Sequence, residues 1–275
     1  MRKYELTSEI IEVTGHTLHR IKALKDFGFV KAGELGGWVE SEENLSHDGD
    51  CWVYEDAKVY EDAKVFDNAM VYGSAMIYGS AHIYDDAEVS GNAMVFANAE
   101  VYRNARVCDN AMVSGDVDIY DNAEVCGNAM VYDNAMVYRD AKVYGYAKVC
   151  DNAMIYDSAW VYDDSMVHGV ARVCGNAMIR GNAEVCGNAE IYGNAILCYD
   201  AKVSNNTDYI VFKNFWSSGR YFTWTRSNNK GKVGCFYGTG ENLIKKAYAD
   251  SEKSGREYER VVRYVESILT DEQKN

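Results

Sequence analysis

The sequence contains no proline among its 275 residues. Proline lacks the backbone N–H that a β-ladder needs, so its absence suits a chain whose strands are paired throughout. The sequence also lacks any run near the ~20 apolar residues of a membrane span. Its first residues, MRKYELTSEIIEV, carry charges where a signal peptide would have a hydrophobic core. We therefore expect a cytoplasmic protein with no membrane partner.

Positive charge is in short supply. Lysine and arginine number 28 against 42 acidic residues, which gives a net charge of −14. Residues 1–50 carry −4, residues 51–207 carry −13 and residues 208–275 carry +3. Because phosphate is repelled by an acidic surface, this balance argues against non-specific DNA binding. The eight cysteines, with no secretion signal, are expected to be free thiols.

One pattern dominates the rest of the chain. From Val53 to Val203 an aliphatic residue returns at every sixth position without an insertion, which makes 26 units of the form [V/I]-x-[D/G]-[N/D/S]-A-x. Alanine holds the fifth position in 23 of them, and Val117, Ser165 and Thr207 are the exceptions. A period of six fits neither a helix nor a simple strand, and it indicates a repeat architecture.

The residue types within one six-residue unit indicate how the chain folds there. The aliphatic residue points inward and its neighbours point outward, so each unit begins as a very short strand. Asn, Asp and Gly then form a turn, since they tolerate positive φ, and the small alanine fits a tight corner. Three units close one 18-residue rung, and rungs stack at about 4.8 Å through strand pairing.

This pattern resembles the hexapeptide repeat of left-handed parallel β-helix proteins. The entry segment VKAGELGGWVESEENLSHDGDCWVYEDAKV (residues 30–59) looks like the start of bacterial and phage hexapeptide proteins often labelled putative transferases. The resemblance implies a left-handed triangular solenoid of about nine coils. It also implies a bacterial cell or a phage-infected host cell as the setting.

The two ends differ from the repeat. Residues 1–50 are expected to form a β cap, because an open solenoid end would otherwise template aggregation. Residues 51–207 form the solenoid, and residues 208–275 a β-β-β-α-α module. Its strands are predicted in YIVFKNF, RYFTWTR and KVGCFY. Thr239 opens the first helix, and Ser254 to Glu257 is read as a capping box for the second. The apolar face of that second helix comprises Tyr258, Val261, Val262, Val265, Ile268 and Leu269.

Catalytic residues are not predicted. The family's acyltransferases use a histidine base beside a loop thrown out from the coils, and its zinc enzymes use three convergent imidazoles. Only His82 and His168 fall on the solenoid, on different faces. Neither family motif is present. The sequence therefore favours a protein that is not an enzyme and has no cofactor. An acyltransferase with an unrecognised site stays open.

One column of the solenoid contains side chains of the types that bind zinc. Cys150, His168 and Cys186 share one outward column in three consecutive rungs, with Glu184 two residues before Cys186. Thiolate, imidazole and carboxylate are zinc ligands, but the outer two backbones of this ladder lie about 9.6 Å apart. Incidental packing is therefore favoured, and no metal site is predicted.

Writing the solenoid in rows of 18 separates three outer faces. On the methionine face, four successive rungs present methionine beside a mostly aromatic partner and no charge. Met is common at adaptable interfaces, and an apolar patch of a few hundred Å² suggests a contact. We expect a homo-oligomer, dimer or trimer, through Met76, Tyr78, Met94, Phe96, Met112, Met130, Tyr132 and Met166.

The second face, here the tyrosine face, has a column of stacked aromatic residues, which is explained by ladder stability alone. Its members are Phe66, Tyr84, Tyr102, Tyr120, Tyr138, Tyr156, Cys174 and Tyr192. The third face, the mixed face, alternates Trp, Met and charged residues from Trp52 to Met178.

The C-terminal module gathers cations and aromatic residues, which together suit a phosphate and a stacked base. A possible ligand site comprises Arg220, Trp224, Arg226, Lys230 and Lys232. The competing interpretation is that a 68-residue module needs these aromatics for its own core.

Three functions remain open from the sequence. The first is a non-enzymatic binding or scaffold protein, a rigid oligomerising solenoid that displays the C-terminal module. The second is a phage-type inhibitor or sponge that sequesters a nucleotide ligand or a host protein. The third is the hexapeptide acyltransferase.

Overall fold

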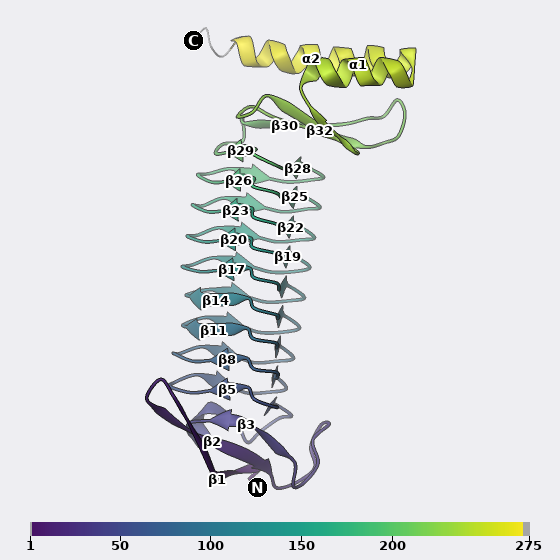
Figure 1. The fold of residues 1–275 in the computed structure, drawn as a ribbon. Coiled ribbons are helices and arrows are strands. Elements are labelled where there is room, and N and C mark those ends of the chain that lie inside the picture. The colour runs from purple at the N-terminus through teal and green to yellow at the C-terminus, as the bar shows by residue number, and fades with distance from the viewer. Residues whose placement is uncertain (1, 272–275) are drawn as a thin grey trace.

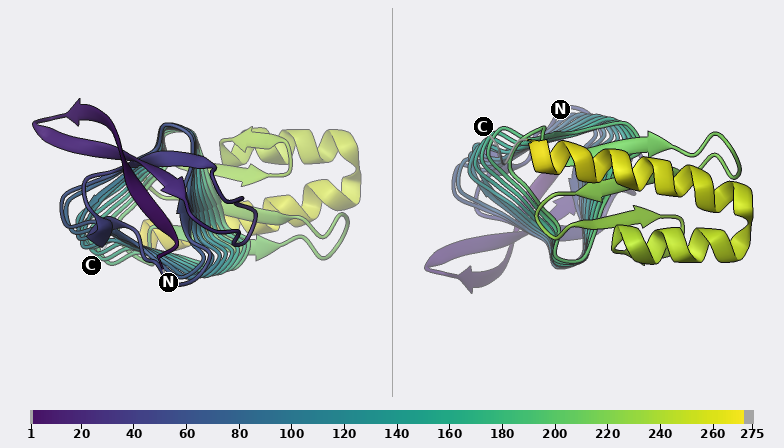
Figure 2. Two further views of the ribbon diagram at one scale, coloured as in Figure 1. Left: turned by 90° about the horizontal axis from the view of Figure 1, so that it is seen from below. Right: turned by 90° about the horizontal axis from the view of Figure 1, so that it is seen from above.

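The computed structural model describes residues 2–271. It is a column of stacked rungs, with the N-terminal strands at one end and a small sheet with two helices at the other (Figure 1). Viewed along the column, the rungs superimpose, and the N-terminal hairpin and the helices project to opposite sides (Figure 2). The structure confirms a mainly β solenoid of nine turns with a small α+β module at its C-terminal end.

Three sheets form the walls of the column, one for each face predicted from the sequence, and their repeat strands are all parallel. The methionine face lies on a sheet of 12 strands: β1 (Tyr4–Val13), β2 (His16–Ala23), β3 (Leu35–Val39), β5 (Lys58–Val59), β8 (Met76–Ile77), β11 (Met94–Ala97), β14 (Met112–Gly115), β17 (Met130–Val131), β20 (Lys148–Val149), β23 (Met166–Val167), β26 (Glu184–Val185) and β29 (Lys202–Val203). Its first three strands are not part of the repeat.

The other two walls contain repeat strands only. The tyrosine face has eight: β6 (Lys64–Val65), β9 (His82–Ile83), β12 (Glu100–Val101), β15 (Asp118–Ile119), β18 (Met136–Val137), β21 (Met154–Ile155), β24 (Arg172–Val173) and β27 (Glu190–Ile191). The mixed face has nine: β4 (Trp52–Val53), β7 (Met70–Val71), β10 (Glu88–Val89), β13 (Arg106–Val107), β16 (Glu124–Val125), β19 (Lys142–Val143), β22 (Trp160–Val161), β25 (Met178–Ile179) and β28 (Ile196–Leu197).

Each rung is tied to the next by backbone hydrogen bonds at a spacing of one rung. The N–H of Lys58 donates to the carbonyl of Ala75 at 2.9 Å, and the N–H of Tyr60 donates to that of Ile77 at 3.1 Å. The same pairs recur up the column, so residue i always lies below residue i+18. The aliphatic and alanine positions of the repeat fill the interior and are fully buried.

The two residues of each corner pair have different roles. Positive φ falls on the first residue of the pair, usually Asp or Gly, as at Asp67 (φ 55°) and Gly73 (φ 74°). The asparagine that follows instead links rungs through its side chain, as in the 3.0 Å bond from Asn92 Nδ2 to Asn110 Oδ1. Corner aspartates bond likewise to the rung above, where Asp151 Oδ2 accepts from the Gly169 N–H at 2.8 Å.

Not all cysteines are free thiols. Cys108 and Cys126 form a disulfide, so the expectation of eight free thiols was wrong for this pair. The two residues occupy one outward column of the mixed face in adjacent rungs, which sets their Cα atoms 4.6 Å apart. That separation lies within the range a disulfide can bridge. Stacking at a period of 18 thus brings the two thiols together, independently of any secretion signal.

The N-terminal segment closes the lower end of the column. β1 pairs with β2, β2 with β3, and β3 lies parallel to β5, where it satisfies carbonyls that have no rung below them. The Trp38 N–H donates to the carbonyl of Ala57, and the Asn44 side chain, in the 3-10 turn Glu42–Asn44, donates to that of Ala63. Lys3 is fully buried, and its ammonium group donates to the carbonyl of Cys51 at 2.9 Å.

The C-terminal module contains four antiparallel strands, β30 (Tyr209–Lys213), β31 (Tyr221–Thr225), β32 (Lys230–Val233) and β33 (Phe236–Gly238). The sequence predicts only three strands here. The run KVGCFY is divided between β32 and β33 because Gly234 adopts a positive φ of 54° and reverses the chain. No helix among the described residues is long and apolar enough to cross a membrane.

Two helices, α1 (Gly240–Asp250) and α2 (Glu252–Asp271), pack on this sheet. Thr239 caps α1, as predicted. The capping box at Ser254 was wrong, because α2 begins two residues earlier and Ser251 Oγ accepts the Ser254 N–H at 3.1 Å. The predicted apolar face of α2 is confirmed at Tyr258, Val262 and Val265, which are buried; the side chain of Leu269 lies outside the described residues.

The module also caps the upper end of the solenoid. The last rung has backbone N–H groups with no rung above them. Side chains of the C-terminal segment accept hydrogen bonds from these groups. Thr223 Oγ1 accepts from the Ile196 N–H at 2.9 Å, and Ser227 Oγ accepts from the Lys202 N–H at 2.8 Å. The solenoid therefore ends in side-chain hydrogen bonds at its top and in β3 and Asn44 at its base.

We predict that Thr223→Val removes the acceptor for Ile196 and lowers the local free energy of opening of the last rung by about 1 kcal/mol. Hydrogen exchange of the Ile196 amide measures this directly. Thr17→Val, on the exposed hairpin, is the control and should leave that amide unchanged. Unaltered protection of Ile196 in Thr223→Val would show that this bond does not hold the cap.

Candidate binding sites

The predicted interface residues form one surface, with a single exception. Met76, Met94, Met112 and Met130 are direct register partners along β8, β11, β14 and β17. Each side chain is half-buried. Met166 stands apart because Lys148 comes between it and Met130 in the register. The methionine ladder is therefore four rungs tall.

A second column runs beside the methionines, and it is broken at one rung. The rings of Tyr60, Tyr78 and Phe96 are stacked, with centroids 5.2 and 4.8 Å apart. Ser114 takes the next position, and Tyr132 follows it. Because Ser114 has no ring, the column has a hollow of about 350 Å³ at this rung, here called the Ser114 notch. It is lined by Met112, Ser114, Gly115, Met130, Tyr132 and Asp133.

The column continues above the notch in a more polar form. The positions after Tyr132 are Cys150, His168, Cys186 and Ser204. A hydrogen bond with Cys150, together with burial, raises the pKa of Tyr132 to about 12, so this phenol stays protonated. The methionine face is thus apolar in its lower half and rich in metal-binding side chains in its upper half.

The lower end of this face already has an apolar cover from the same chain. Leu18 of the N-terminal hairpin is fully buried in a cluster with Trp38 and Tyr60. Ile11, Val13 and Tyr78 pack against that cluster. The hairpin therefore covers the first rung of the aromatic column, and the face above it, from Met94 to Tyr132, has no such cover among the described residues.

The tyrosine face follows the interpretation that stacking explains it. Five successive ring pairs, from Phe66–Tyr84 to Tyr138–Tyr156, are stacked at centroid distances between 4.9 and 5.1 Å. Burial raises the pKa of Tyr102 to about 12. The hydroxyl of Tyr84 donates to Glu100 at 2.9 Å. These rings are satisfied within their own ladder.

The predicted C-terminal ligand residues do not form one surface. In the antiparallel register, Thr223 lies opposite Lys232 and Thr225 opposite Lys230. Opposed residues share a face of a sheet, so both lysines lie on the solenoid side of the module, whereas Trp224 lies on the helix side. Lys232 is buried and donates to the carbonyl of Gly234, and Lys230 pairs with Asp200 at 3.7 Å. Arg220 is exposed and does not line the pocket that Trp224 lines.

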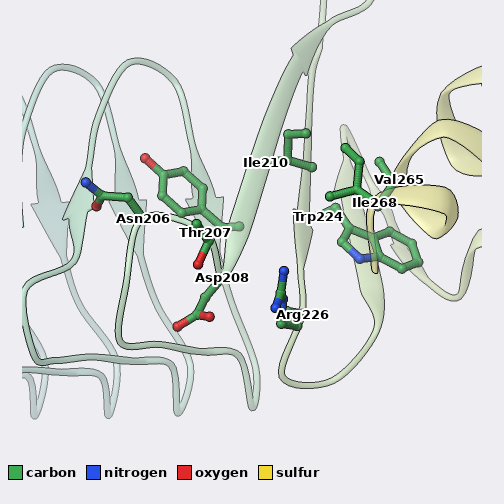
Figure 3. A pocket seen from close by; sticks show the side chains of 9 residues that line it. Asn206, Thr207, Asp208, Ile210, Trp224, Arg226, Val265 and Ile268 are labelled. Carbon is green, nitrogen blue, oxygen red and sulfur yellow. The ribbon is translucent and has the colours of Figure 1, made fainter. Parts of the chain in front are cut away.

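Trp224 and Arg226 both line one pocket, which lies between the last rung and the module (Figure 3). This junction pocket has a volume of about 280 Å³ and is lined by Asn206, Thr207, Asp208, Tyr209, Ile210, Trp224, Arg226, Val265 and Ile268. Trp224 is only 2% exposed, so its ring belongs mainly to the core of the module. Its indole Nε1 is buried without a hydrogen-bond partner among the described residues.

The histidines of the solenoid lie on different walls, as expected. His82 is in β9 on the tyrosine face, and His168 follows β23 on the methionine face. The strands of the solenoid keep their six-residue spacing from β4 to β29, without an inserted loop. The described solenoid residues therefore bring no two imidazoles together.

The comparisons with known proteins agree with the repeat. Four segments, residues 63–79, 105–117, 123–139 and 147–163, match the family model described as YdcK Beta solenoid repeat. All four lie in the solenoid. They confirm the resemblance to transferase-like hexapeptide-repeat proteins.

One curated relative comes from Escherichia coli (strain K12) and is named an uncharacterized acetyltransferase, YdcK. It is 36% identical over 63 residues, which cover 20% of this chain. The match spans 19% of the relative's length. The similarity thus concerns a stretch of repeat, and the relative's name describes that protein.

Proposed function

We propose that this protein is a non-enzymatic binding scaffold, in which the solenoid pairs with a second copy through the methionine face and displays the C-terminal module. The observation that carries the proposal is the ladder Met76–Met94–Met112–Met130 beside an aromatic column with one ring missing. This surface consists of half-buried, flexible side chains, with no charge in the ladder and Asp133 among the residues that line the notch. Such a surface is suited to a partner of the same kind.

The notch gives the pairing a definite geometry. In a dimer with a two-fold axis along the strand direction, each column faces the same column of the partner in reversed order. With the axis between the rungs of Phe96 and Ser114, the Phe96 ring of one copy enters the Ser114 notch of the other. Met94 then faces the Met112 position, and Tyr78 faces the Tyr132 position. Methionine and aromatic columns are both self-complementary in this arrangement.

The hairpin supports the same conclusion. Its residue Leu18 is buried in one cluster with Tyr60, and Ile11, Val13 and Tyr78 pack against that cluster. The hairpin thus already covers the start of this column. Four rungs at about 4.8 Å supply only a few hundred Å² of apolar area, whereas a stable interface buries about 800 Å² per partner. The corners beside the ladder and the hairpin would supply the remainder.

The acyltransferase alternative is less well supported. Its imidazole base would have to stand at a cleft, and His82 and His168 occupy separate walls of a solenoid without an inserted loop. The relative named an acetyltransferase shares only a stretch of repeat with this chain. Fold and repeat alone do not carry an activity from one protein to another.

The first test places charge in the methionine ladder. Met94→Lys with Met112→Lys should reduce the particle from about twice the 30.9 kDa chain mass to that of one chain, because an unpaired ammonium group is costly to bury. Association should weaken about 100-fold or more. Sedimentation equilibrium measures both quantities.

The matched control is Met136→Lys with Met154→Lys. These two methionines are register partners in the same way, but on the tyrosine face. This variant should keep the mass of the unaltered protein. Equal masses for all three proteins would rule out pairing through the methionine face.

The second test fills the notch. Ser114→Phe continues the ring stack between Phe96 and Tyr132, so the single chain should fold at least as stably, while the seat for the partner's Phe96 is lost. We expect a monomer with an unchanged or higher melting temperature. Ser90→Phe, at the equivalent position of the mixed face, is the control and should leave association unchanged. A Ser114→Phe protein that associates normally would contradict the proposed geometry.

A second candidate function, sequestering of a nucleotide-type ligand, is favoured by one feature of the junction pocket. The buried Trp224 Nε1 has no acceptor among the described residues, and such an orphan donor normally costs about 1–3 kcal/mol unless a partner is supplied. The volume of about 280 Å³ suits a single base or another small ring. A ligand acceptor at Nε1 would satisfy the indole.

Thermal shift against a panel of nucleotides and acyl-CoA separates the alternatives. If the pocket binds a nucleotide, the melting temperature rises, and Trp224→Phe, which removes only the N–H donor and one ring, weakens that response at least tenfold in ligand concentration. Stabilisation by acyl-CoA would instead favour the acyltransferase. No response to either class would rule out the sequestering function and leave the scaffold.

A further inference from the structure

The upper half of the methionine face holds a cluster of three side chains that the sequence analysis named as possible zinc ligands but did not predict to converge. The ligand atoms of His168, Glu184 and Cys186 all lie within 4.8 Å of one another. A site built on Cys150, His168 and Cys186 would span three rungs, too far for one ion. The cluster in the structure spans only two, since Glu184 and Cys186 flank Val185 in β26 and His168 follows β23 directly below.

The side chains converge for a simple reason. The side chains of residues 184 and 186 both point outward, and residue 168 lies directly below residue 186 in the same column. The imidazole leans across toward the glutamate, so that His168 Nε2 and Glu184 Oε1 lie 3.3 Å apart. A tetrahedral zinc ion with Zn–N and Zn–O bonds of 2.0–2.2 Å requires ligand atoms about 3.3–3.5 Å apart. The observed separation therefore already has the size of a metal ligand pair.

Each of the three side chains also has a supporting contact. His168 Nδ1 lies 3.8 Å from Asp151 Oδ2, which is longer than a hydrogen bond, so a small shift of the imidazole would form the carboxylate–imidazole pair that orients a zinc-binding histidine. Lys202 holds the other oxygen of Glu184, Oε2, at 2.6 Å. Cys186 Sγ lies 3.3 Å from Ser204 Oγ, which can donate to a thiolate.

The charge at the site suits a cation. Glu184 supplies a carboxylate within the cluster itself. Asp151 adds a second carboxylate at the rim. Lys202 pairs with Oε2 of Glu184 and leaves Oε1, the oxygen beside His168, for the ion.

We propose that His168, Glu184 and Cys186 bind one zinc-like divalent cation, with Asp151 orienting the imidazole. Nitrogen, oxygen and sulfur ligands in one set select zinc over the hard cations magnesium and calcium. Three protein ligands on an open face leave a fourth position for water. The site lies two rungs above Tyr132 and does not depend on the pairing of two chains.

The experiment uses the full chain with its Cys108–Cys126 disulfide intact, after metal ions have been removed with a chelator. Titration calorimetry with Zn²⁺ should give one ion per chain. Co²⁺ as a probe should give a thiolate-to-cobalt charge-transfer band together with the intense visible bands of a tetrahedral ion. His168→Ala and Cys186→Ser should each weaken Zn²⁺ binding about 100-fold or more, and Asp151→Asn about 10-fold.

Two controls make the outcome specific. Cys235→Ser removes an exposed thiol far along the chain, and Cys150→Ser removes the neighbouring thiol of the same column. Both should bind Zn²⁺ as the unaltered protein does, and far-ultraviolet circular dichroism should be the same for every variant. Absence of one-to-one binding, binding that survives His168→Ala and Cys186→Ser, or loss of binding in Cys150→Ser would each overturn the proposal.

Discussion

The whole molecule depends on one constraint, the hydrogen bond from each outward residue to the carbonyl of the rung above. This bond joins the N–H of residue i to the carbonyl of residue i+17. Every position of the repeat therefore lies directly below the position 18 residues later. A side chain is therefore multiplied into a column, and a substitution in the repeat changes a face at a known height. The methionine ladder, the stacked tyrosines, the disulfide and the zinc-ligand cluster are all consequences of this single register.

The same constraint leaves two ends that must be closed. At the base the exposed groups are carbonyls, and backbone N–H groups of β3 and the amide of Asn44 donate to them. At the top they are N–H groups, and hydroxyls of Thr223 and Ser227 accept them. The cap at each end thus has the polarity that the rung leaves unsatisfied. The N-terminal cap also extends over the methionine face, which links the closing of the column to its proposed pairing surface.

The sequence predicted what the period controls. The rung, the three walls, the buried aliphatic and alanine positions and the composition of each face follow from a repeat of six. Prediction was weaker where a side chain turns within its column. The lean of His168 toward Glu184 depends on a rotamer, and the Cys108–Cys126 bond on two thiols meeting in one column. In the module there is no repeat, so the division of β32 from β33 and the start of α2 depend on local turns. The proposed ligand set there failed to gather because alternation along β31 and β32 sends Trp224 and Lys232 to opposite faces.

The proposed dimer is tested most directly by distances between copies. A nitroxide carried by an encoded side chain can replace either Asn152 or Asn188, two exposed corners in one column and two rungs apart. In the antiparallel dimer with its axis between Phe96 and Ser114, each rung away from the axis separates the two labels by two rung heights. Pulsed dipolar spectroscopy should then give a distance about 19 Å longer at position 188 than at position 152. Equal distances at the two positions, or no coupling between copies at either, would contradict the account.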